Sequence, residues 1–207
     1  MGLGRSYAGQ DCSLARALEV VGERWTLLVL RDCFYGVRRF ADFRAHLDIP
    51  RAVLADRLKA LTALGVLERR PHVTGVEVDY VLTARGLDLW PTVFTLAQWG
   101  ERWLAPQGAR RYFTHAPCDT QVTATGWCPA CETLPPPADL LIHQGPGADP
   151  ELRTDRVSAA LRKAPHRLLT ELFPSPSTPA SAPLAPADPP APADAPASAP
   201  SAPAATP

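Results

Sequence analysis

Apolar residues recur at helical spacing through the first half of the chain. Leu14, Leu18 and Val21 lie on one face of a predicted first helix, which Gly22 would end. Residues 24–36, RWTLLVLRDCFYG, are apolar nearly all round. A helix of that kind is normally buried on every side, so this segment predicts the centre of a helical core.

The next two apolar stripes predict a helix-turn-helix. One stripe runs through residues 38–47 and the other through residues 50–63, where leucines recur at positions i, i+4 and i+7. Between the stripes stand only Asp48, Ile49 and Pro50. So short a connection indicates a tight corner between two helices.

Alternating apolar and polar residues follow directly. Residues 66–73 and 76–83 predict two strands joined at Thr74 and Gly75, where glycine can supply a positive φ. A helix-turn-helix followed by a hairpin is the winged-helix layout. We therefore expect a mainly α-helical fold with a small β-hairpin wing.

A last helix is predicted over residues 87–104, and it has two apolar faces. One face carries Trp90, Val93, Phe94 and Ala97, and the other carries Leu89, Leu96, Trp99 and Trp103. Two such faces exceed what one small core can cover, so we expect a homodimer in which a partner helix covers the second face. The alternative is that residues 138–173 cover it.

Composition divides the rest of the chain. We assign residues 11–105 to a winged-helix DNA-binding and dimerisation domain, and residues 106–137 to a small zinc-ribbon-like extension. Residues 138–173 form a C-terminal extension with one short helix predicted before Pro165. Residues 174–207 are rich in proline and alanine and are predicted to be disordered, because such a segment buries too little apolar surface to offset its chain entropy.

Charge points to a nucleic-acid partner only locally. The whole chain is balanced, with 21 Lys and Arg residues against 21 Asp and Glu residues, but basic residues outnumber acidic ones between residues 38 and 70. Arg51 begins the second helix of the helix-turn-helix, where base edges of a major groove are reached. We predict contacts with double-stranded DNA from Arg38, Arg39, Arg51, Ala52, Ala55, Asp56, Lys59, Arg69, Arg70 and His72. The alternatives are a purely structural unit and a protein-binding winged helix.

A string of motifs resembles one family. The segments CSLARALEVVGERWTLLVLRDCFYGVRRFADFRAHL, IPRAVLADRLKALTALGVLERR and VDYVLTARG follow one another in order. They resemble the HxlR-type winged-helix regulators of bacteria, which are related to the MarR group. The resemblance covers residues 12–104 and implies a homodimer on a near-palindromic operator, usually as a repressor. The wing tip departs from the family, because Glu77 stands where a basic residue would favour DNA.

Cys12 matches a cysteine with which some members of this family sense oxidants or electrophiles. It stands at the predicted start of a helix, where the helix dipole favours the thiolate. Other members keep the cysteine without a sensing role, so a purely structural residue is the alternative. Cys33 lies inside the most apolar helix and is expected to be inert.

The remaining cysteines have metal-ligand spacing. His115-x2-Cys118 and Cys128-x2-Cys131 offer one imidazole and three thiolates, a set suited to a structural tetrahedral Zn²⁺. Glycines that often follow such ligands are replaced by Asp119 and Glu132. The competing interpretation is a redox pair formed by the last two cysteines.

Other classes of function find little support. The sequence contains no nucleophile elbow, glycine-rich phosphate loop or zinc-protease motif, so we expect that the protein is not an enzyme. A thiol-redox protein that uses the C-terminal cysteines is the opposing hypothesis. With neither a signal-peptide core nor a membrane span in the sequence, a cytoplasmic location is expected. The sequence does not identify an effector.

Overall fold

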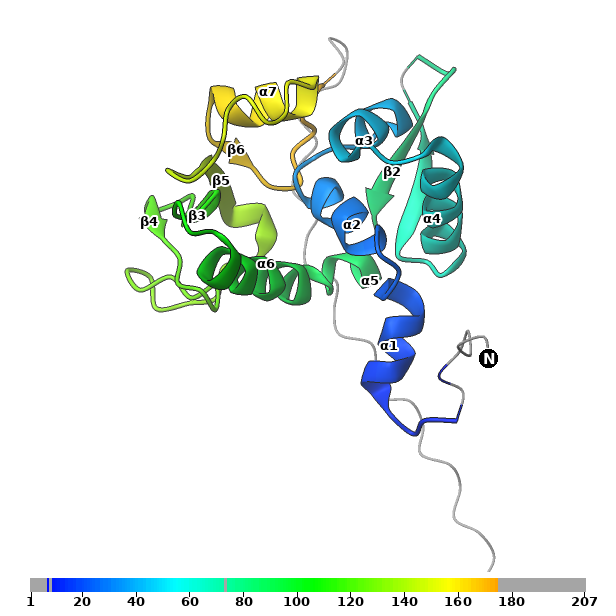
Figure 1. Ribbon diagram of the computed structural model, residues 1–207, viewed down its shortest axis with the longest axis horizontal. Coiled ribbons are helices and arrows are strands. Elements are labelled where there is room, and N and C mark those ends of the chain that lie inside the picture. Colours follow the sequence, from blue (N-terminus) through cyan, green and yellow to red (C-terminus); the bar gives the residue numbers. More distant parts are fainter. Residues whose placement is uncertain (1–6, 8, 73, 175–207) are drawn as a thin grey trace, which may run out of the picture.

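The computed structural model describes residues 7, 9–72 and 74–174 of the chain. All but the first residue of the predicted disordered tail, residues 174–207, lies outside this described part. Figure 1 shows two units side by side, a winged helix and a smaller sheet-containing unit, with one long helix running beneath the second.

The winged helix contains the elements in the predicted order. Its helices and strands are α1 (Ser13–Val21), α2 (Thr26–Phe34), α3 (Phe40–Leu47), α4 (Arg51–Ala63), β1 (Leu67–Pro71) and β2 (Val78–Leu82). Leu54, Leu58 and Leu61 are each at most 1% exposed, which confirms the inward face of α4. The winged-helix fold is thus confirmed.

The corner between α3 and α4 follows from its three residues. Asp48 ends α3 in the left-handed region, with φ of 52°, a conformation that Asp adopts more readily than most residues. Ile49 is 2% exposed and anchors the corner in the core. Pro50 precedes α4 with a φ of −57°, which its ring fixes in advance.

The wing is an antiparallel hairpin. β1 and β2 pair from Leu67 opposite Leu82 to Pro71 opposite Val78. Gly75 has the expected positive φ, 72°, but β1 ends at Pro71 and β2 begins at Val78, so both strands are shorter and the connection is longer than predicted. Thr83 follows the hairpin and caps α5 (Ala84–Leu87), because its side chain accepts a hydrogen bond from the Gly86 amide.

Helix α6 (Trp90–Leu104) connects the two units through one of its faces. Trp90 packs against Phe34 of α2, with ring centroids 4.9 Å apart. Phe94 packs against Phe113, which belongs to the second unit, at 5.3 Å. The first predicted apolar face of this helix is therefore buried between the two units.

The second unit is built on an antiparallel sheet that the sequence did not predict. In the described part of the chain its strands have the order β4-β3-β5-β6. These elements, with the helices that accompany them, are β3 (Arg111–His115), β4 (Thr120–Gln121), η1 (Pro137–Asp139), β5 (Leu140–Gln144), α7 (Arg156–Lys163) and β6 (His166–Arg167). Strand β3 pairs along β5, with His115 opposite Leu140. This pairing joins residues 106–137 and residues 138–173, which composition assigns to two separate segments, in one sheet.

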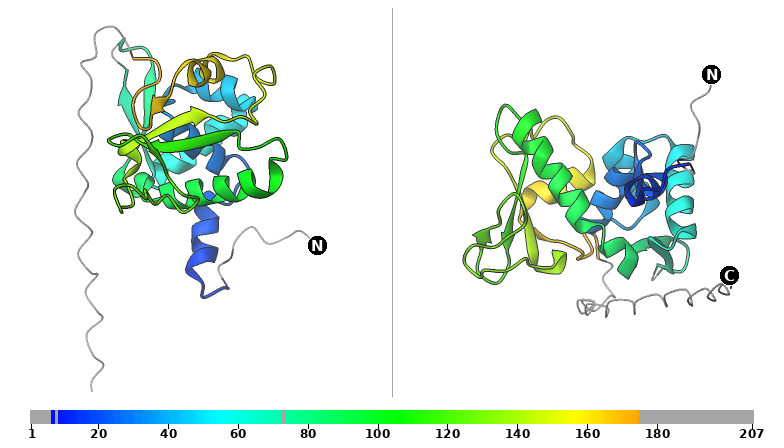
Figure 2. Two further views of the ribbon diagram at one scale, coloured as in Figure 1. Left: turned by 90° about the vertical axis from the view of Figure 1, so that its left-hand side faces the viewer. Right: turned by 90° about the horizontal axis from the view of Figure 1, so that it is seen from below.

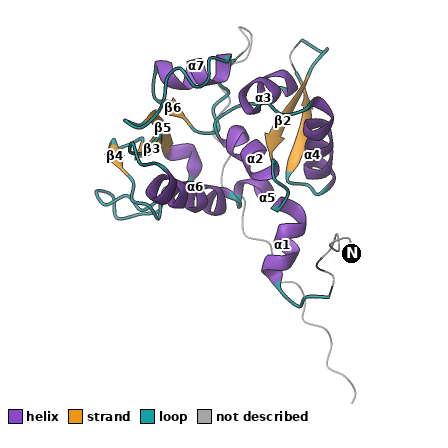
Figure 3. Cartoon of the chain, viewed as in Figure 1, coloured by secondary structure: helices purple, strands orange, loops and turns teal. Residues whose placement is uncertain are grey.

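The second face of α6 is open except at Leu89, the residue before the helix, which is half-buried against the core. Leu96, Trp99 and Trp103 of that face and the neighbouring Leu104 are 50–63% exposed, and Leu14 and Leu18 of α1 are 66% and 40% exposed. Figures 1 and 2 show α1 extending away from the rest of the winged helix. Figure 3 shows that the strands of the second unit lie on the far side of α2 from the wing. Among the described residues, no helix combines the length and apolarity needed to cross a membrane.

Candidate functional site

The outer face of α4 gathers half of the predicted DNA-contacting residues. Arg51, Ala52, Ala55, Asp56 and Lys59 are all exposed, because the leucines between them turn inward. The exposed side chains are small at the centre and charged around it. A face of this kind can approach the edges of base pairs closely.

Arg51 at the start of α4 has a neighbour that sequence reasoning missed. Its guanidinium lies over the ring of Phe40, 5.6 Å from the centroid. Arg44 of α3 is exposed and lines the same open hollow at the corner between the two helices. Its place on the polar side of α3, opposite the apolar stripe, was the available signal. The two arginines together place positive charge at the corner where α3 ends and α4 begins, which we call the front of the helix-turn-helix.

The wing separates the hairpin residues that were predicted together. Arg69 and Arg70 are exposed, and Arg70 forms an ion pair with Glu68. His72 is only 5% exposed, and its Nδ1 lies 3.1 Å from Oδ2 of Asp79. The ring of His72 therefore pairs with Asp79 across the hairpin, at the turn end of β1, and does not join the exposed basic surface.

Arg38 and Arg39 are also held inside the molecule. Arg38 Nη1 lies 3.4 Å from Oε2 of Glu171, and Arg39 Nη2 lies 3.3 Å from Oε1 of the same residue. Arg39 Nη2 also donates to the backbone oxygen of Phe173 at 3.0 Å. Both arginines are half-buried. Both guanidinium groups are ion-paired with the C-terminal segment, so they do not form part of the exposed basic surface.

A cluster of possible metal ligands lies in the second unit. The ligand atoms of His115, Cys118, Cys128 and Cys131 all lie within 4.8 Å of one another. Cys118 Sγ is 3.4 Å from His115 Nδ1 and 3.5 Å from Cys128 Sγ. The two predicted pairs are brought together from a strand end and a separate loop. This cluster could hold a metal ion.

The backbone around the cluster has the shape of paired metal-binding turns. Asp119 and Glu132, which directly follow the second ligand of each pair, have φ of 52° and 50°. The left-handed region is where glycine would be favoured. The amides of Cys118 and Asp119 both donate to the His115 carbonyl, at 3.1 and 2.8 Å. The turn geometry is thus present without the glycines.

The thiols of the cluster differ in acidity. Hydrogen bonds from the side chain and backbone of Thr120 lower the pKa of Cys118 to about 6. A hydrogen bond shared with Cys118, above all, raises the pKa of Cys131 to about 11. A cation that binds here would therefore meet one thiolate already formed at neutral pH and would displace protons from other ligands.

The two cysteines of the winged helix lie in opposite environments. Cys12 is exposed at the N-cap of α1, where its side chain makes no capping hydrogen bond. Cys33 is buried in α2, and this burial, with the nearby charge of Asp32, raises its pKa well above the usual value. Only Cys12 of these two is accessible to a reagent in solution.

Known proteins resemble this chain chiefly in the winged helix. A family model described as HxlR-like helix-turn-helix matches residues 20–108. The uncharacterized HTH-type transcriptional regulator MT3179 of Mycobacterium tuberculosis is 39% identical over 144 residues, which are 69% of this chain and 91% of the relative. The similarly named YvaP of Bacillus subtilis is 32% identical over 94 residues, 44% of this chain and 86% of the relative. The solved reduced form of the transcriptional regulator YodB from B. subtilis is 28% identical, with a TM-score of 0.41, and the match covers 47% of this chain and 98% of YodB.

The similarity to MT3179 extends beyond the winged helix. The 144 matched residues exceed the whole chain up to residue 108, so the match includes part of the second unit. The relative is matched over 91% of its length at 39% identity. The chain therefore belongs to the HxlR-like helix-turn-helix family, whose members are DNA-binding regulators and not enzymes.

Proposed function

We propose that the protein is a homodimeric transcriptional regulator that binds a near-palindromic operator and acts as a repressor. The observation that carries the proposal is the exposed face of α4, with Arg51 and Arg44 at its front and Lys59 farther along. On a helix-turn-helix this face enters the major groove, and a residue at the helix start reaches base edges. Arg69 and Arg70 would contact the DNA backbone beside it.

A second copy of the chain accounts for the open apolar faces. Exposed apolar side chains lie on α6, which runs beneath the second unit, and on α1, which extends away from the winged helix. Trp and Leu side chains at this density are costly to leave in water. Two copies joined through these helices would present two α4 helices to the two halves of an operator.

The test starts with duplexes selected by the full-length protein from a random DNA library. We expect a strong preference for the selected duplex over bulk competitor DNA at moderate salt. Arg51→Ala should reduce discrimination by about 1–3 kcal/mol if the guanidinium pairs with a guanine. Arg70→Ala should weaken all duplexes alike and lower the salt dependence by about one charge.

Lys163→Ala is the matched control for these variants. Lys163 is exposed on α7, far from α4 in the sequence, and its removal takes away one positive charge. It should leave both affinity and discrimination unchanged. No preference of the wild-type protein for any duplex would overturn the proposal and favour a protein-binding winged helix.

The His115, Cys118, Cys128 and Cys131 cluster is proposed to bind a structural Zn²⁺. Three soft thiolates and an imidazole match the ligands that zinc prefers and leave no position for a substrate. Elemental analysis of protein purified without a histidine tag should find about one zinc per chain, by the usual stoichiometry of such sites. Cys128→Ser should lower the content. Metal-free protein with a folded second unit would contradict zinc and favour a thiol-redox pair.

Cys12 is proposed to act as an oxidant-reactive thiol. Its support is the combination of exposure, the position at the N-cap of α1, and the open apolar face of the same helix. A bulky or disulfide-linked group at this position would disturb the helix through which we propose that the two copies meet.

A further inference from the structure

The second unit holds the first helix of the helix-turn-helix through an arginine. Arg153 Nη2 donates to the backbone oxygens of Ala45 and His46, at 2.7 and 2.5 Å. These carbonyls lie in the last turn of α3, where no partner exists within the helix. A positive charge there also matches the negative end of the helix dipole. Arg153 therefore caps the end of α3 that leads into the corner before α4.

A second arginine fixes the side of the same helix. Arg156 begins α7 and forms two hydrogen bonds with Asp42, of which the contact from Nη2 to Oδ2 is 2.7 Å. Asp42 is only 3% exposed. A carboxylate at this depth is costly to leave without its partner, so the pair ties the start of α7 to α3. The Arg156 guanidinium also lies 4.0 Å from the centroid of the Phe173 ring.

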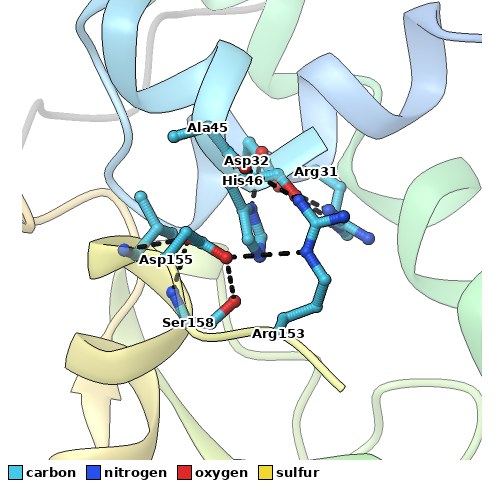
Figure 4. Close-up of polar contacts among 8 residues, drawn as sticks. Arg31, Asp32, Ala45, His46, Arg153, Asp155 and Ser158 are labelled. Atoms are coloured by element: carbon cyan, nitrogen blue, oxygen red, sulfur yellow. Dashed lines mark hydrogen bonds and ion pairs between the residues drawn. The ribbon is translucent and has the colours of Figure 1, made fainter. Parts of the chain in front are cut away.

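His46 extends the contact into the centre of the winged helix. Its Nδ1 lies 2.8 Å from Oδ2 of Asp32, which is fully buried on α2, and Arg31 donates to the other oxygen of Asp32 at 2.7 Å. Asp155 caps α7 by accepting hydrogen bonds from the amide and hydroxyl of Ser158. Figure 4 shows these groups gathered where α2, α3 and the start of α7 meet. The polar network thus joins three helices.

Helix α7 also packs on the sheet whose strand β3 ends at the metal ligand His115. Val157 and Leu161 are 0% and 3% exposed and belong to the same buried cluster as Ile142 of β5. β5 pairs along β3, and the ligand His115 stands opposite Leu140 at the end of that pairing. An unbroken series of packed elements therefore runs from the metal ligands through β5 and α7 to α3.

We propose that Arg153 and Arg156 couple metal binding at His115, Cys118, Cys128 and Cys131 to the helix-turn-helix, so that loss of the metal loosens α3 and weakens DNA binding. This inference rests on the proposed DNA-binding and zinc functions. A bound metal stabilises the turns beside β3 because an unfolded chain holds it poorly. The sheet then supports α7, and α7 supplies the partners of the last turn of α3. When the metal is lost, the turns beside β3 loosen first, then the sheet and α7, and finally the last turn of α3.

The experiment compares wild-type protein, Arg153→Ala/Arg156→Ala and the control Lys163→Ala, each full length, reduced, and with or without a zinc chelator. Two quantities are measured: amide hydrogen exchange in residues 40–47, and affinity for a duplex selected by the wild-type protein. In wild type and control, chelation should speed exchange and weaken binding, each by about tenfold, within the usual range of coupling between sites. In the double variant both quantities should already be altered with zinc bound, and chelation should change neither by more than about twofold.

The outcomes separate the coupling from the functions on which it rests. Equal effects of chelation on wild type and the double variant, or faster exchange in residues 111–144 without any change in residues 40–47, would overturn the coupling. Absence of zinc by elemental analysis would overturn the coupling together with the zinc proposal. If the wild-type protein binds no duplex, the DNA-binding proposal and the predicted effect of the metal on DNA binding are overturned, and faster exchange in residues 40–47 on chelation would support only the coupling to α3. If the double variant folds poorly, Arg153→Lys/Arg156→Lys replaces it, because lysine keeps both charges but loses the hydrogen-bond geometry of the guanidinium. Chelation must then change exchange in residues 40–47 and duplex affinity less than it does in wild type.

Discussion

At the scale of single residues, Cys12 is exposed to solvent and begins a helix through which we propose that the two copies meet. The thiol is exposed at the N-terminal end of α1, where an oxidant in solution can reach it. We predict that diamide or a quinone, at doses that leave the zinc content unchanged, alters duplex affinity in wild type but not in Cys12→Ser. The measurement is a binding titration before and after treatment. Cys33→Ser should respond as wild type does, since Cys33 is buried, and equal responses in wild type and Cys12→Ser would exclude Cys12 as the sensor.

Asp119 and Glu132 show how far residue identities predict a site. The ligand spacing is visible in the sequence, but the missing glycines count against a metal centre. In the structure both residues adopt the left-handed conformation, and the cost for a non-glycine residue is modest at a single position. Hydrogen bonds to the His115 carbonyl hold the first turn. Composition cannot reveal that compensation, because it depends on contacts made after folding.

At the scale of elements, α6 has two apolar faces with different fates. Trp90, Val93 and Phe94 are buried within one chain, whereas Trp99 and Trp103 remain 54% and 63% exposed. We predict that Trp99→Glu/Trp103→Glu shifts the protein from dimer to monomer without unfolding it, because the substituted positions are outside the core. Light scattering gives the mass and circular dichroism checks the helix content.

Leu152→Glu is a suitable control for that variant. Leu152 is 73% exposed in the second unit, so the change adds a charge to an exposed apolar position that is not on α6. It should leave the oligomeric state as in wild type. A monomeric wild-type protein, or a double variant that stays dimeric, would contradict the assignment of α6 as the contact between copies.

The helices of the winged helix could be predicted because residues 24–36 are apolar nearly all round and the other helices carry a repeating apolar stripe. The strands of the second unit could not. β3 reads RYFTH and β5 reads LLIHQ, and neither alternates cleanly between apolar and polar residues. Each is stabilised by pairing with the other across a long stretch of chain, from His115 to Leu140 at one end. Pairing of that kind is a tertiary property, which local pattern does not encode.

At the scale of the whole molecule, the basic surface is smaller than local charge suggests. Arg38 and Arg39 add to the predicted footprint, but Glu171, far along the chain, holds both. His72 is likewise withdrawn beside Asp79. No local window of the sequence contains Glu171 together with the two arginines, whereas Asp79 lies on the strand that pairs with β1. The exposed positions on α4 could be predicted from helical periodicity alone. The loss of Arg38 and Arg39 required knowledge of how the two units pack, and the loss of His72 required the register of the wing hairpin.

Helix α6 also bears on the length of the operator. The helix is fixed to the winged helix through Trp90 and Phe34, and its open face is where we place the second copy. The angle at which two such helices cross would then set the separation of the two α4 helices, which on straight DNA must match one helical turn of about 34–36 Å or a multiple of it. The helix would thus determine the distance between the two half-sites that one dimer can bind. A substitution on its open face that tilts the crossing would change which spacing of half-sites is preferred while leaving the bases read within each half-site the same.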